Sequence, residues 1–288
     1  MLEKDKKIKK CDLHIHSYYS DGALSPKELI KKAKEVKLSS ISITDHDCIK
    51  AVKEVKNNSY LGSLELVEGL ELTTSYYNDE VHILAYLVDT KSDFFNKKID
   101  EAYQIRQIRF KEIVERLILE GVAIDKEAIL AEVKDIAPTR LHLAKYLLKI
   151  KQVNSIYEAF RRYLGPGKAG YICRSRFSSK EAIDFIHRSR GLAFLAHPHK
   201  LIKQEWIDDF LSFGIDGIEA VYPTMSHKEQ SFYREYALEN NLLLSGGSDF
   251  HQDFNKLRGI GCVDVPYDWV LKMKQRKKEM VALKEYKI

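Results

Sequence analysis

The chain has 288 residues, of which 44% are hydrophobic and 31% charged, and its formal net charge is only +5. This balance is typical of a globular protein, and the length can bury a full core in one large or two modest domains. No apolar run approaches the roughly 20 residues that a membrane span needs, and the charged N-terminus lacks the apolar segment of a secretion signal. We therefore expect a cytoplasmic protein without a membrane partner.

Lysines gather near both ends of the chain, at 4–10 and 272–280. Charge runs of this kind are typical of solvated tails, and so small a net charge does not by itself predict a nucleic-acid surface. The four cysteines, at 11, 48, 173 and 262, show no close spacing. The sequence therefore indicates neither a zinc–thiolate site nor a disulfide framework. Cys48 lies two residues after His46, and we expect it to be a buried free thiol rather than a metal ligand.

The first third of the chain alternates short β-type runs with helical patterns. The β-type runs are CDLHIH (11–16), SISIT (40–44), LELVEGLELT (64–73) and VHILAYLV (81–88). The helix that begins at Pro26 is well signalled, because Ser25 and Glu28 form a capping box. A second helix is expected near 47–57. Repeated β–α alternation predicts a mainly parallel α/β sheet.

The β-type runs stop between about 94 and 164. Apolar residues recur there at helical spacing in DEAYQIRQIRFKEIVERLILEG (100–121), and further helical patterns follow near 126–134, 139–149 and 154–164. We interpret residues 94–170, which end in GPGKAG, as a helical insertion in a domain formed by 1–93 and 171–288. The insertion either completes the core or acts as a lid over a site.

The β–α alternation resumes after the insertion. A capped helix is expected at 178–191, followed by the strand LAFLAH (192–197), a helix near 203–213, GIEAVY (217–222), a helix near 226–240 and LLLSGGSDFH (242–251). The whole pattern predicts the α/β class with one helical interruption.

Most of the ten histidines fall in short motifs with carboxylates in or near them, and one further motif offers only a carboxylate. These are DLHIHSYYSDG (12–22), TDHD (44–47), GLE (69–71), EVHIL (80–84), AHPH (196–199) and SDFH (248–251). Histidines that serve only in packing would be scattered along the chain. The pattern therefore indicates a metal site with more than one ion.

The spacing within two of these motifs is informative. His14 and His16 are two residues apart in an alternating run, so in a strand they share one face about 7 Å apart. Asp249 and His251 repeat this spacing after Gly246 and Gly247. A lone pair of this kind is more often two exposed histidines on a strand, but the five further motifs favour ligands of a common site.

In this order, the motifs HIHS with SDG, TDHD, GLELTT, VHIL, AHP and GSDFH resemble the PHP (polymerase and histidinol phosphatase) family of metal-dependent phosphoesterases. PTRLHLAKYL (138–147) and YLGPGKAGYICR (163–174) resemble its stand-alone 3′,5′-nucleotide bisphosphate phosphatase branch. The resemblance implies a distorted seven-stranded β/α barrel with a helical insertion.

The resemblance also implies two to three divalent ions held by nine ligands. The first ion would be held by His14, His16, Glu71 and Asp249; the second by Glu71, His82 and His197; the third by Asp21, His46 and His251. Ligation by histidine and carboxylate without thiolates suits Mn, Fe or Zn, and does not choose among them.

The same resemblance points to groups that would hold a substrate phosphate. Arg140 and His142 are the main candidates, with Arg174 and Lys168 as further ones, and His199 would support a ligand or donate a proton from outside the metal shell. Without the resemblance, Arg140 would be interpreted as a surface arginine at a helix start.

The activity implied is hydrolysis of a phosphate ester of a small nucleotide, a 3′,5′-bisphosphate or the end of a short oligonucleotide, by a metal-activated hydroxide. One alternative in the same class is a histidinol-phosphate phosphatase. A non-catalytic metal-stabilised binding module is another, and amidohydrolase chemistry on a C–N bond is the third. We expect a small phosphorylated partner, either a nucleotide or a short oligonucleotide.

Overall fold

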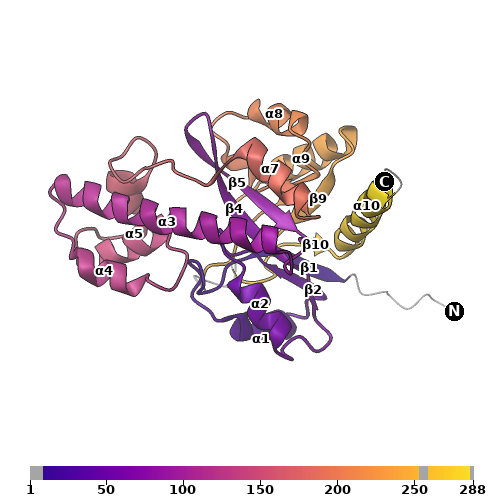
Figure 1. Ribbon diagram of the computed structural model, residues 1–288, viewed down its shortest axis with the longest axis horizontal. Helices are drawn as coiled ribbons and strands as arrows, with labels where there is room; N and C mark the ends of the chain where they lie inside the picture. Colours follow the sequence, from indigo (N-terminus) through magenta and orange to yellow (C-terminus); the bar gives the residue numbers. More distant parts are fainter. Residues whose placement is uncertain (1–8, 253–258, 286–288) are drawn as a thin grey trace.

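The structure, a computed structural model, describes residues 9–252 and 259–285 and contains two β-sheets flanked by helices (Figure 1). The first sheet has the order β10 (Val265–Pro266), β1 (Lys10–Ile15), β2 (Ser40–Ile43) and β3 (Glu65–Leu66). The second has the order β6 (Phe177–Ser178), β4 (Gly69–Tyr76), β5 (Asp79–Tyr86), β7 (Leu192–Leu195), β8 (Gly217–Val221) and β9 (Leu243–Gly246).

Most neighbouring strands are parallel, but β5 is antiparallel to both β4 and β7, and β10 is antiparallel to β1. The run 64–73, expected as one strand, is divided between β3 and β4. Because β5 runs against its neighbours, its first half lies at the edge where the parallel strands end. This reversal decides which of its residues reach that edge.

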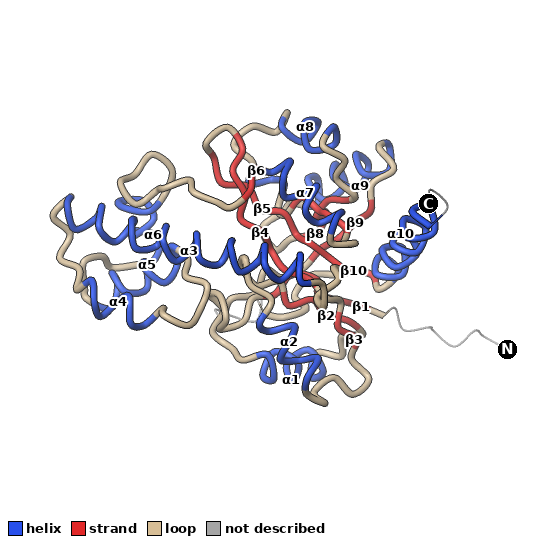
Figure 2. The backbone as a smooth tube through the Cα atoms, in the orientation of Figure 1, coloured by secondary structure: helices blue, strands red, loops and turns tan. Residues whose placement is uncertain are grey.

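The two sheets approach each other at their strand ends, where isolated bridges join Ile15 to Phe250 and His46 to Glu71. In Figure 2 the red strands lie in the centre of the molecule and blue helices lie around them. The predicted α/β class is confirmed, while residues 9–252 and 259–285 form two sheets rather than one closed barrel. The count of seven barrel strands stays a prediction.

Helices cover the outer faces of both sheets (Figure 1). They are α1 (Pro26–Glu35), α2 (Lys50–Asn57), α7 (Ser179–Arg188), α8 (Trp206–Ser212), α9 (His227–Glu239) and α10 (Asp268–Glu285), with a short 3₁₀ turn at Pro198–Lys200. The capping box predicted at Ser25 and Glu28 is confirmed, and α7 begins with a second one, from Ser178 and Glu181.

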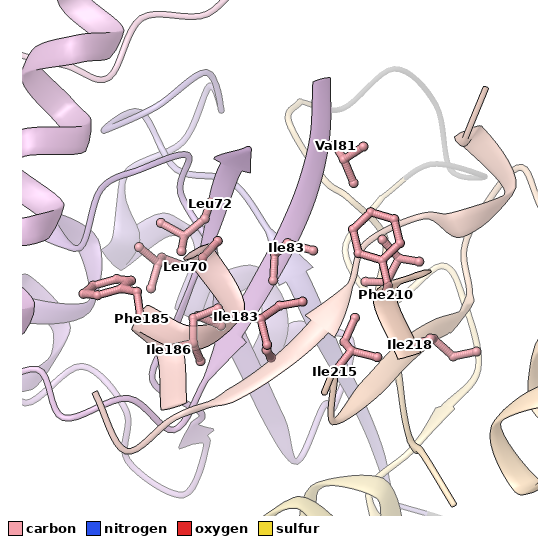
Figure 3. Close-up of a cluster of buried hydrophobic side chains, with 14 of the residues drawn as sticks. Leu70, Leu72, Val81, Ile83, Ile183, Phe185, Ile186, Phe210, Ile215 and Ile218 are labelled. Atoms are coloured by element: carbon pink, nitrogen blue, oxygen red, sulfur yellow. The ribbon is translucent and has the colours of Figure 1, made fainter. Parts of the chain in front are cut away.

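The main hydrophobic core lies between the second sheet and the helices that follow it (Figure 3). Leu70 and Leu72 of β4 and Ile83 of β5 meet Ile183 of α7 and Phe210 of α8, and all five are fully buried. Cys48 is a buried free thiol, as predicted, and Cys11 is buried as well, whereas Cys173 and Cys262 are only partly buried.

The helical segment consists of α3 (Asp93–Leu119), α4 (Lys126–Glu132), α5 (Arg140–Lys149), α6 (Ile156–Ala159) and the π-helix η1 (Phe160–Leu164). The first half of α3 packs Phe95 and Ile99 into the main core, whereas its second half packs Val114 and Leu117 into a separate core with Leu147 of α5. One long helix thus contributes side chains to two hydrophobic cores. The division of the chain at 94 and 170 remains a prediction.

One of the two lysine runs is part of a helix. Residues 272–280 lie on α10, so the predicted solvated tail is wrong there, whereas most of 4–10 lies outside the described residues. Parts of the predicted barrel domain, at 1–8, 253–258 and 286–288, also lie outside them. Across 9–252 and 259–285, no helix combines the length and apolarity needed to cross a bilayer. The cytoplasmic location stays a prediction.

Candidate metal centre

The nine predicted ligands gather at one edge of the sheets. His14 and Glu71 lie within β1 and β4, His82 lies in the first half of β5, and the others follow strand ends: His16 and Asp21 after β1, His46 after β2, His197 after β7, and Asp249 and His251 after β9. Parallel strands end at a common edge, and the antiparallel β5 begins there. The topology therefore brings side chains from the whole length of the chain together.

Glu71 lies at the centre of this cluster and is 1% exposed. Five imidazoles surround its two oxygens. Oε1 lies 2.9 Å from His82 Nδ1 and 3.1 Å from His197 Nε2, and Oε2 lies 3.1 Å from His46 Nδ1, 3.3 Å from His16 Nε2 and 3.4 Å from His14 Nε2. A carboxylate with one oxygen toward each side can bridge two ions.

Asp249 and Asp21 complete the cluster on either side of His16. Asp249 Oδ1 lies 3.1 Å from His16 Nε2 and 3.3 Å from His14 Nε2. Asp21 Oδ1 lies 3.2 Å from His251 Nε2 and 3.7 Å from His16 Nδ1. Every predicted ligand is therefore linked to the others through contacts shorter than 4 Å.

Several buried nitrogen and oxygen atoms of the cluster could each bind a metal cation. His14 Nε2, His16 Nε2, His46 Nδ1, His82 Nδ1 and Asp21 Oδ1 are buried and make no hydrogen bond among the described residues. Such atoms cost about 1–3 kcal/mol each when they have no partner, and a divalent ion would satisfy several at once.

Three sets of these donors lie within 4.8 Å of one another: His14, His16 and Asp249; His46, Glu71 and His82; and His16, Asp21, His46 and His251. His16 and His46 thus belong to two sets each, which differs from the grouping that the resemblance implies. Which ligands hold which ion stays a prediction.

The electrostatics keep the carboxylates ionised. Burial alone would raise the pKa of Glu71, but the imidazoles of His82, His46 and His14 hold it well below its usual range. Burial alone would also raise the pKa of Asp249, but His14 and His251 hold it well below its usual range. Ionised carboxylates of this kind are ready to bind cations.

Two further carboxylates orient the histidines. Glu219, fully buried in the middle of β8, accepts a hydrogen bond from His14 through Nδ1 at 3.0 Å and another from the His197 backbone N–H at 2.7 Å. Glu80 lies 3.1 Å from His82 Nε2. Such partners fix which ring nitrogen faces a metal. From the sequence, Glu219 could equally have been a core residue at a strand end.

Several motif residues hold the backbone beside the cluster in place and do not contribute ligands to it. Asp45 accepts hydrogen bonds from the Ser17 backbone N–H and from both the Ser17 and Ser20 hydroxyls, which holds the loop before Asp21. At Gly247 a Cβ atom would lie 2.4 Å from the His14 backbone nitrogen, so only glycine fits.

Two candidate ligands have strained backbones. His197 and Asp249 have φ angles of 30° and 47°, a region that non-glycine residues rarely adopt. Strain of this kind persists where the surroundings over-determine the conformation, and it is concentrated at functional sites.

A cavity of about 440 Å³ opens over the cluster and has two unlike walls. One wall carries candidate metal ligands together with Lys200. The other comes from α3, α5, η1 and the residues before α5: Arg106, Arg109, Phe110, Ile113, Pro138, Thr139, Arg140, Leu141 and Phe160. The helical segment therefore forms part of the site.

Arg106 and Arg109 of α3 were not anticipated from the sequence. Both are 6% exposed and occupy the buried face of α3 together with Ile99, Ala102 and Ile113. Two arginines on the apolar stripe of an amphipathic helix were the available signal, because lone charges are rarely buried there. Arg106 donates to Asp47 from Nε at 2.8 Å and to the Pro138 carbonyl at 3.1 Å.

The predicted phosphate-binding residues lie in different places. Arg140 lines the cavity. His142 receives the Thr139 backbone N–H on Nδ1 at 3.0 Å and so caps α5. Arg174 is exposed and paired with Glu112.

Lys168 is exposed, and neither it nor Arg174 is among the described residues that line the cavity. His199 lies 3.0 Å from the Thr224 hydroxyl, with its ring 4.9 Å from that of Tyr222. Burial and the charge of Lys200 lower the pKa of His199 to about 4.

Comparison with known proteins defines the class. Residues 12–257 match the PHP domain, and the chain belongs to this family. It is 32% identical over 250 residues to a 5′-3′ exoribonuclease of Haemophilus influenzae, which covers 84% of this chain and 90% of the relative. It is 28% identical over 257 residues to a 3′,5′-nucleoside bisphosphate phosphatase of Chromobacterium violaceum, with 87% and 90% covered.

Solved structures agree with this class. A protein of Bifidobacterium adolescentis, provisionally named a metal-dependent phosphoesterase, has a TM-score of 0.82 and 26% identity, with 93% of this chain and 96% of that chain covered. An amidohydrolase of Chromobacterium violaceum, solved with sulfate and without metal, has a TM-score of 0.81 and 26% identity, with 91% and 96% covered. The chain is thus a metal-dependent phosphoesterase of the PHP family, and a hydrolase.

Proposed function

We propose that this phosphoesterase hydrolyses a nucleotide, either a nucleoside 3′,5′-bisphosphate or the end of a short oligonucleotide. The observation that carries the proposal is the cavity of about 440 Å³, with metal-ligand candidates on one wall and arginines with apolar side chains on the other. A nucleotide has the same division, because its phosphates are anionic and its base is flat and largely apolar. The volume is within the usual range for small-molecule sites.

In this proposal the nine clustered residues hold two or three divalent ions, and Mn, Fe and Zn are the candidates. Ions bound there would polarise the phosphoryl group and lower the pKa of a bound water. Glu71 supplies a central carboxylate that can face two ions, and Glu219 keeps the His14 ring oriented toward Glu71. The donors thus stay in place before substrate arrives, which lowers the cost of reorganisation.

Lys200 lines the cavity on the metal side, with its Nζ 3.6 Å from Asp249 Oδ2. We assign it the role of neutralising charge on the phosphoryl oxygens. Tyr222 donates to the same Asp249 oxygen at 2.6 Å and also receives a hydrogen bond from Lys200. Asp249 Oδ2 is thereby contacted by both Lys200 and Tyr222, whereas Oδ1 lies beside His14 and His16.

The nucleoside would lie against the helical wall. Phe160, Leu141, Phe110 and Ile113 give this wall its apolar surface. An aromatic ring such as that of Phe160 can stack on a base, worth about 1–3 kcal/mol. We therefore propose that residues 94–170 form the substrate-facing part of a barrel domain made by 1–93 and 171–288, rather than only completing its core.

Two relatives support the choice of substrate. The Chromobacterium violaceum protein is named a 3′,5′-nucleoside bisphosphate phosphatase, and the Haemophilus influenzae protein a 5′-3′ exoribonuclease. Both act on nucleotide phosphates, so the proposal includes a mononucleotide and an oligonucleotide end. Histidinol phosphate, the alternative in the same class, has a single phosphate and would leave the arginines of the helical wall without a second anion.

A hydrolysis screen of protein loaded in turn with Mn, Fe and Zn tests the proposal, with inorganic phosphate measured for the phosphomonoesters and released nucleotides measured for RNA. The panel contains nucleoside mono- and bisphosphates, short RNA and histidinol phosphate, and the Glu71→Gln variant serves as the blank. We expect the highest kcat/KM for a nucleoside bisphosphate or an RNA 5′ end. A higher value for histidinol phosphate would reject the nucleotide assignment while leaving the enzyme class intact.

A further inference from the structure

Asp21, a candidate ligand in the loop after β1, receives a hydrogen bond from the helical segment. The Thr139 hydroxyl donates to Asp21 Oδ2 at 2.8 Å, although the two residues are 118 positions apart in the chain. Oδ2 also lies 3.8 Å from His46 Nε2, and Oδ1 lies 3.2 Å from His251 Nε2 and 3.7 Å from His16 Nδ1. Oδ1 is buried and makes no hydrogen bond among the described residues. The hydroxyl thus occupies one oxygen of the carboxylate and leaves the other for an ion.

The position of Thr139 at the start of α5 directs its hydroxyl hydrogen toward Asp21. Thr139 is the N-cap of this helix, and its Oγ1 accepts the Leu141 backbone N–H at 3.1 Å. A hydroxyl has a single hydrogen, which remains available to a second partner. The competing acceptor, His142 Nδ1, lies farther away at 3.4 Å and already receives the Thr139 backbone N–H at 3.0 Å. The carboxylate is therefore the better acceptor, and a hydrogen bond to it is charge-assisted.

The residues just before α5 are held against the site from two directions. The Ala137 backbone N–H donates to the Tyr19 carbonyl at 2.8 Å, in the same loop as the carboxylate that Thr139 contacts. From the other side, Gln107 of α3 donates to the Ile136 carbonyl at 2.7 Å. Thr139 is thus fixed relative to its partner by bonds that do not involve an ion, so little ordering is needed when one binds.

We propose that Thr139 is a positioning residue for Asp21, and that through this contact the helical segment sets the affinity of one metal ion. The ion is the one whose four candidate donors lie within 4.8 Å of one another: His16, Asp21, His46 and His251. Neither of the other two donor sets contains Asp21, so ions held there should change little. The inference rests on the metal binding in the proposed function and not on its nucleotide substrate. Thr139 also lines the cavity, so the wall that faces the substrate takes part in holding an ion.

Substitutions at Thr139 separate this contact from the role of Thr139 as a helix cap. Thr139→Ser keeps the hydroxyl and therefore both roles. Thr139→Gly removes the hydroxyl, but glycine is well tolerated at an N-cap. Ser155→Gly is the matched control, because the Ser155 hydroxyl caps α6 by accepting the Glu158 backbone N–H at 3.0 Å. Among the hydrogen bonds of the described residues, none joins Ser155 to a candidate metal ligand.

Titration of the metal-free protein with Mn²⁺, with free Mn²⁺ measured by electron paramagnetic resonance, gives the number of bound ions and their dissociation constants. Loss of a group that orients a ligand typically weakens metal affinity about 10- to 100-fold, so Thr139→Gly should weaken one ion by this factor and the others less than about threefold. Thr139→Ser and Ser155→Gly should bind like the wild type. Wild-type binding by Thr139→Gly, equal weakening of every ion, or the same loss in Ser155→Gly would overturn the inference.

Asp21→Asn identifies the ion concerned, because loss of the ligand itself should weaken the same ion. In the double variant with Thr139→Gly, the affinity should fall no further than in Asp21→Asn alone, since the hydroxyl acts only through this carboxylate. Weakening of a different ion, or an additive loss, would show that Thr139 acts by another route. Thermal melts check that each variant folds, and Thr139→Val, which keeps the volume of the side chain, gives the same test if Thr139→Gly does not fold.

Because Mn²⁺ is the only probe, the titration distinguishes failure of the inference from failure of the proposed function. Selective weakening of one ion in Thr139→Gly supports the inference even if the loaded wild type hydrolyses no nucleotide. Wild-type binding by Thr139→Gly rejects it even if nucleotides are hydrolysed. A wild type that binds no Mn²⁺ overturns the inference together with the metal binding of the proposed function.

Discussion

The two walls of the cavity are built in opposite ways. The metal-side wall takes its groups from strand ends and from the loops beside them, so each ligand is fixed by the hydrogen bonds of a buried sheet. The helical wall takes its groups from α3, α5 and η1, which pack around a separate core. In the proposed function, the chemistry and the substrate preference therefore reside on structurally different parts of the chain. Changes to each wall should therefore have different consequences.

The largest effect expected on the metal-side wall comes from removing the metals. Chelation should abolish hydrolysis, because the proposed activity depends on the bound ions. It should also lower the melting temperature, since an ion present at 100 times its dissociation constant contributes about 2.7 kcal/mol, or about 5–11 °C. Elemental analysis and a thermal melt of the same samples measure both effects. Full activity in protein with only trace metal would contradict the prediction.

A single ligand of the same wall should have the next largest effect. Glu71 contacts five imidazoles, whereas Asp21 lies to one side near His251, so Glu71→Gln should cost more activity than Asp21→Asn. We expect a loss of more than about 100-fold for Glu71→Gln, because even residues that only support ligands cost about 10- to 100-fold. Steady-state kinetics under saturating metal compare the two variants. Equal or reversed losses would show that Glu71 does not have the central role.

On the helical wall, Arg140→Lys should alter substrate use and leave metal content unchanged. Lysine keeps the charge but cannot reproduce the planar fork that contacts two oxygens. The kcat/KM for a nucleoside bisphosphate should fall about 10- to 150-fold. Elemental analysis alongside the kinetics distinguishes a loss of substrate binding from a loss of metal. A loss of metal in this variant would remove the distinction between them.

The smallest effect is expected at Arg174. Its side chain is 49% exposed and paired with Glu112, and exposed ion pairs are typically worth about 1 kcal/mol or less. Even if Arg174 contacts a long substrate, Arg174→Gln should reduce kcat/KM no more than about fivefold. Measurements on a mononucleotide and a short RNA would detect a contact confined to the longer substrate. A loss as large as that of Arg140→Lys would extend the binding site beyond the cavity.

The strand and helix pattern was largely predictable, and so was the set of side chains that gather around Glu71, whose role as metal ligands stays a prediction. Local signals such as the box at Ser25 and Glu28 act over four residues and are visible in the sequence. The direction of β5 was not predictable, because an alternating run has the same pattern in either orientation. That direction is what places His82 and Glu80 at the edge where the other strands end.

The sequence by itself determined which residues could bind cations. Imidazole and carboxylate groups can act as metal ligands whatever the fold, and here they lie together in short motifs. The tertiary structure alone decided that Glu80 pairs with Arg109 and Arg140. Arg109 and Glu80 are 29 residues apart, and Arg140 lies 60 residues beyond Glu80. The two arginines look like ordinary helix charges until α3 and α5 pack beside β5. Burial then removes the water that would otherwise solvate them, so Glu80 becomes a partner for both guanidinium groups.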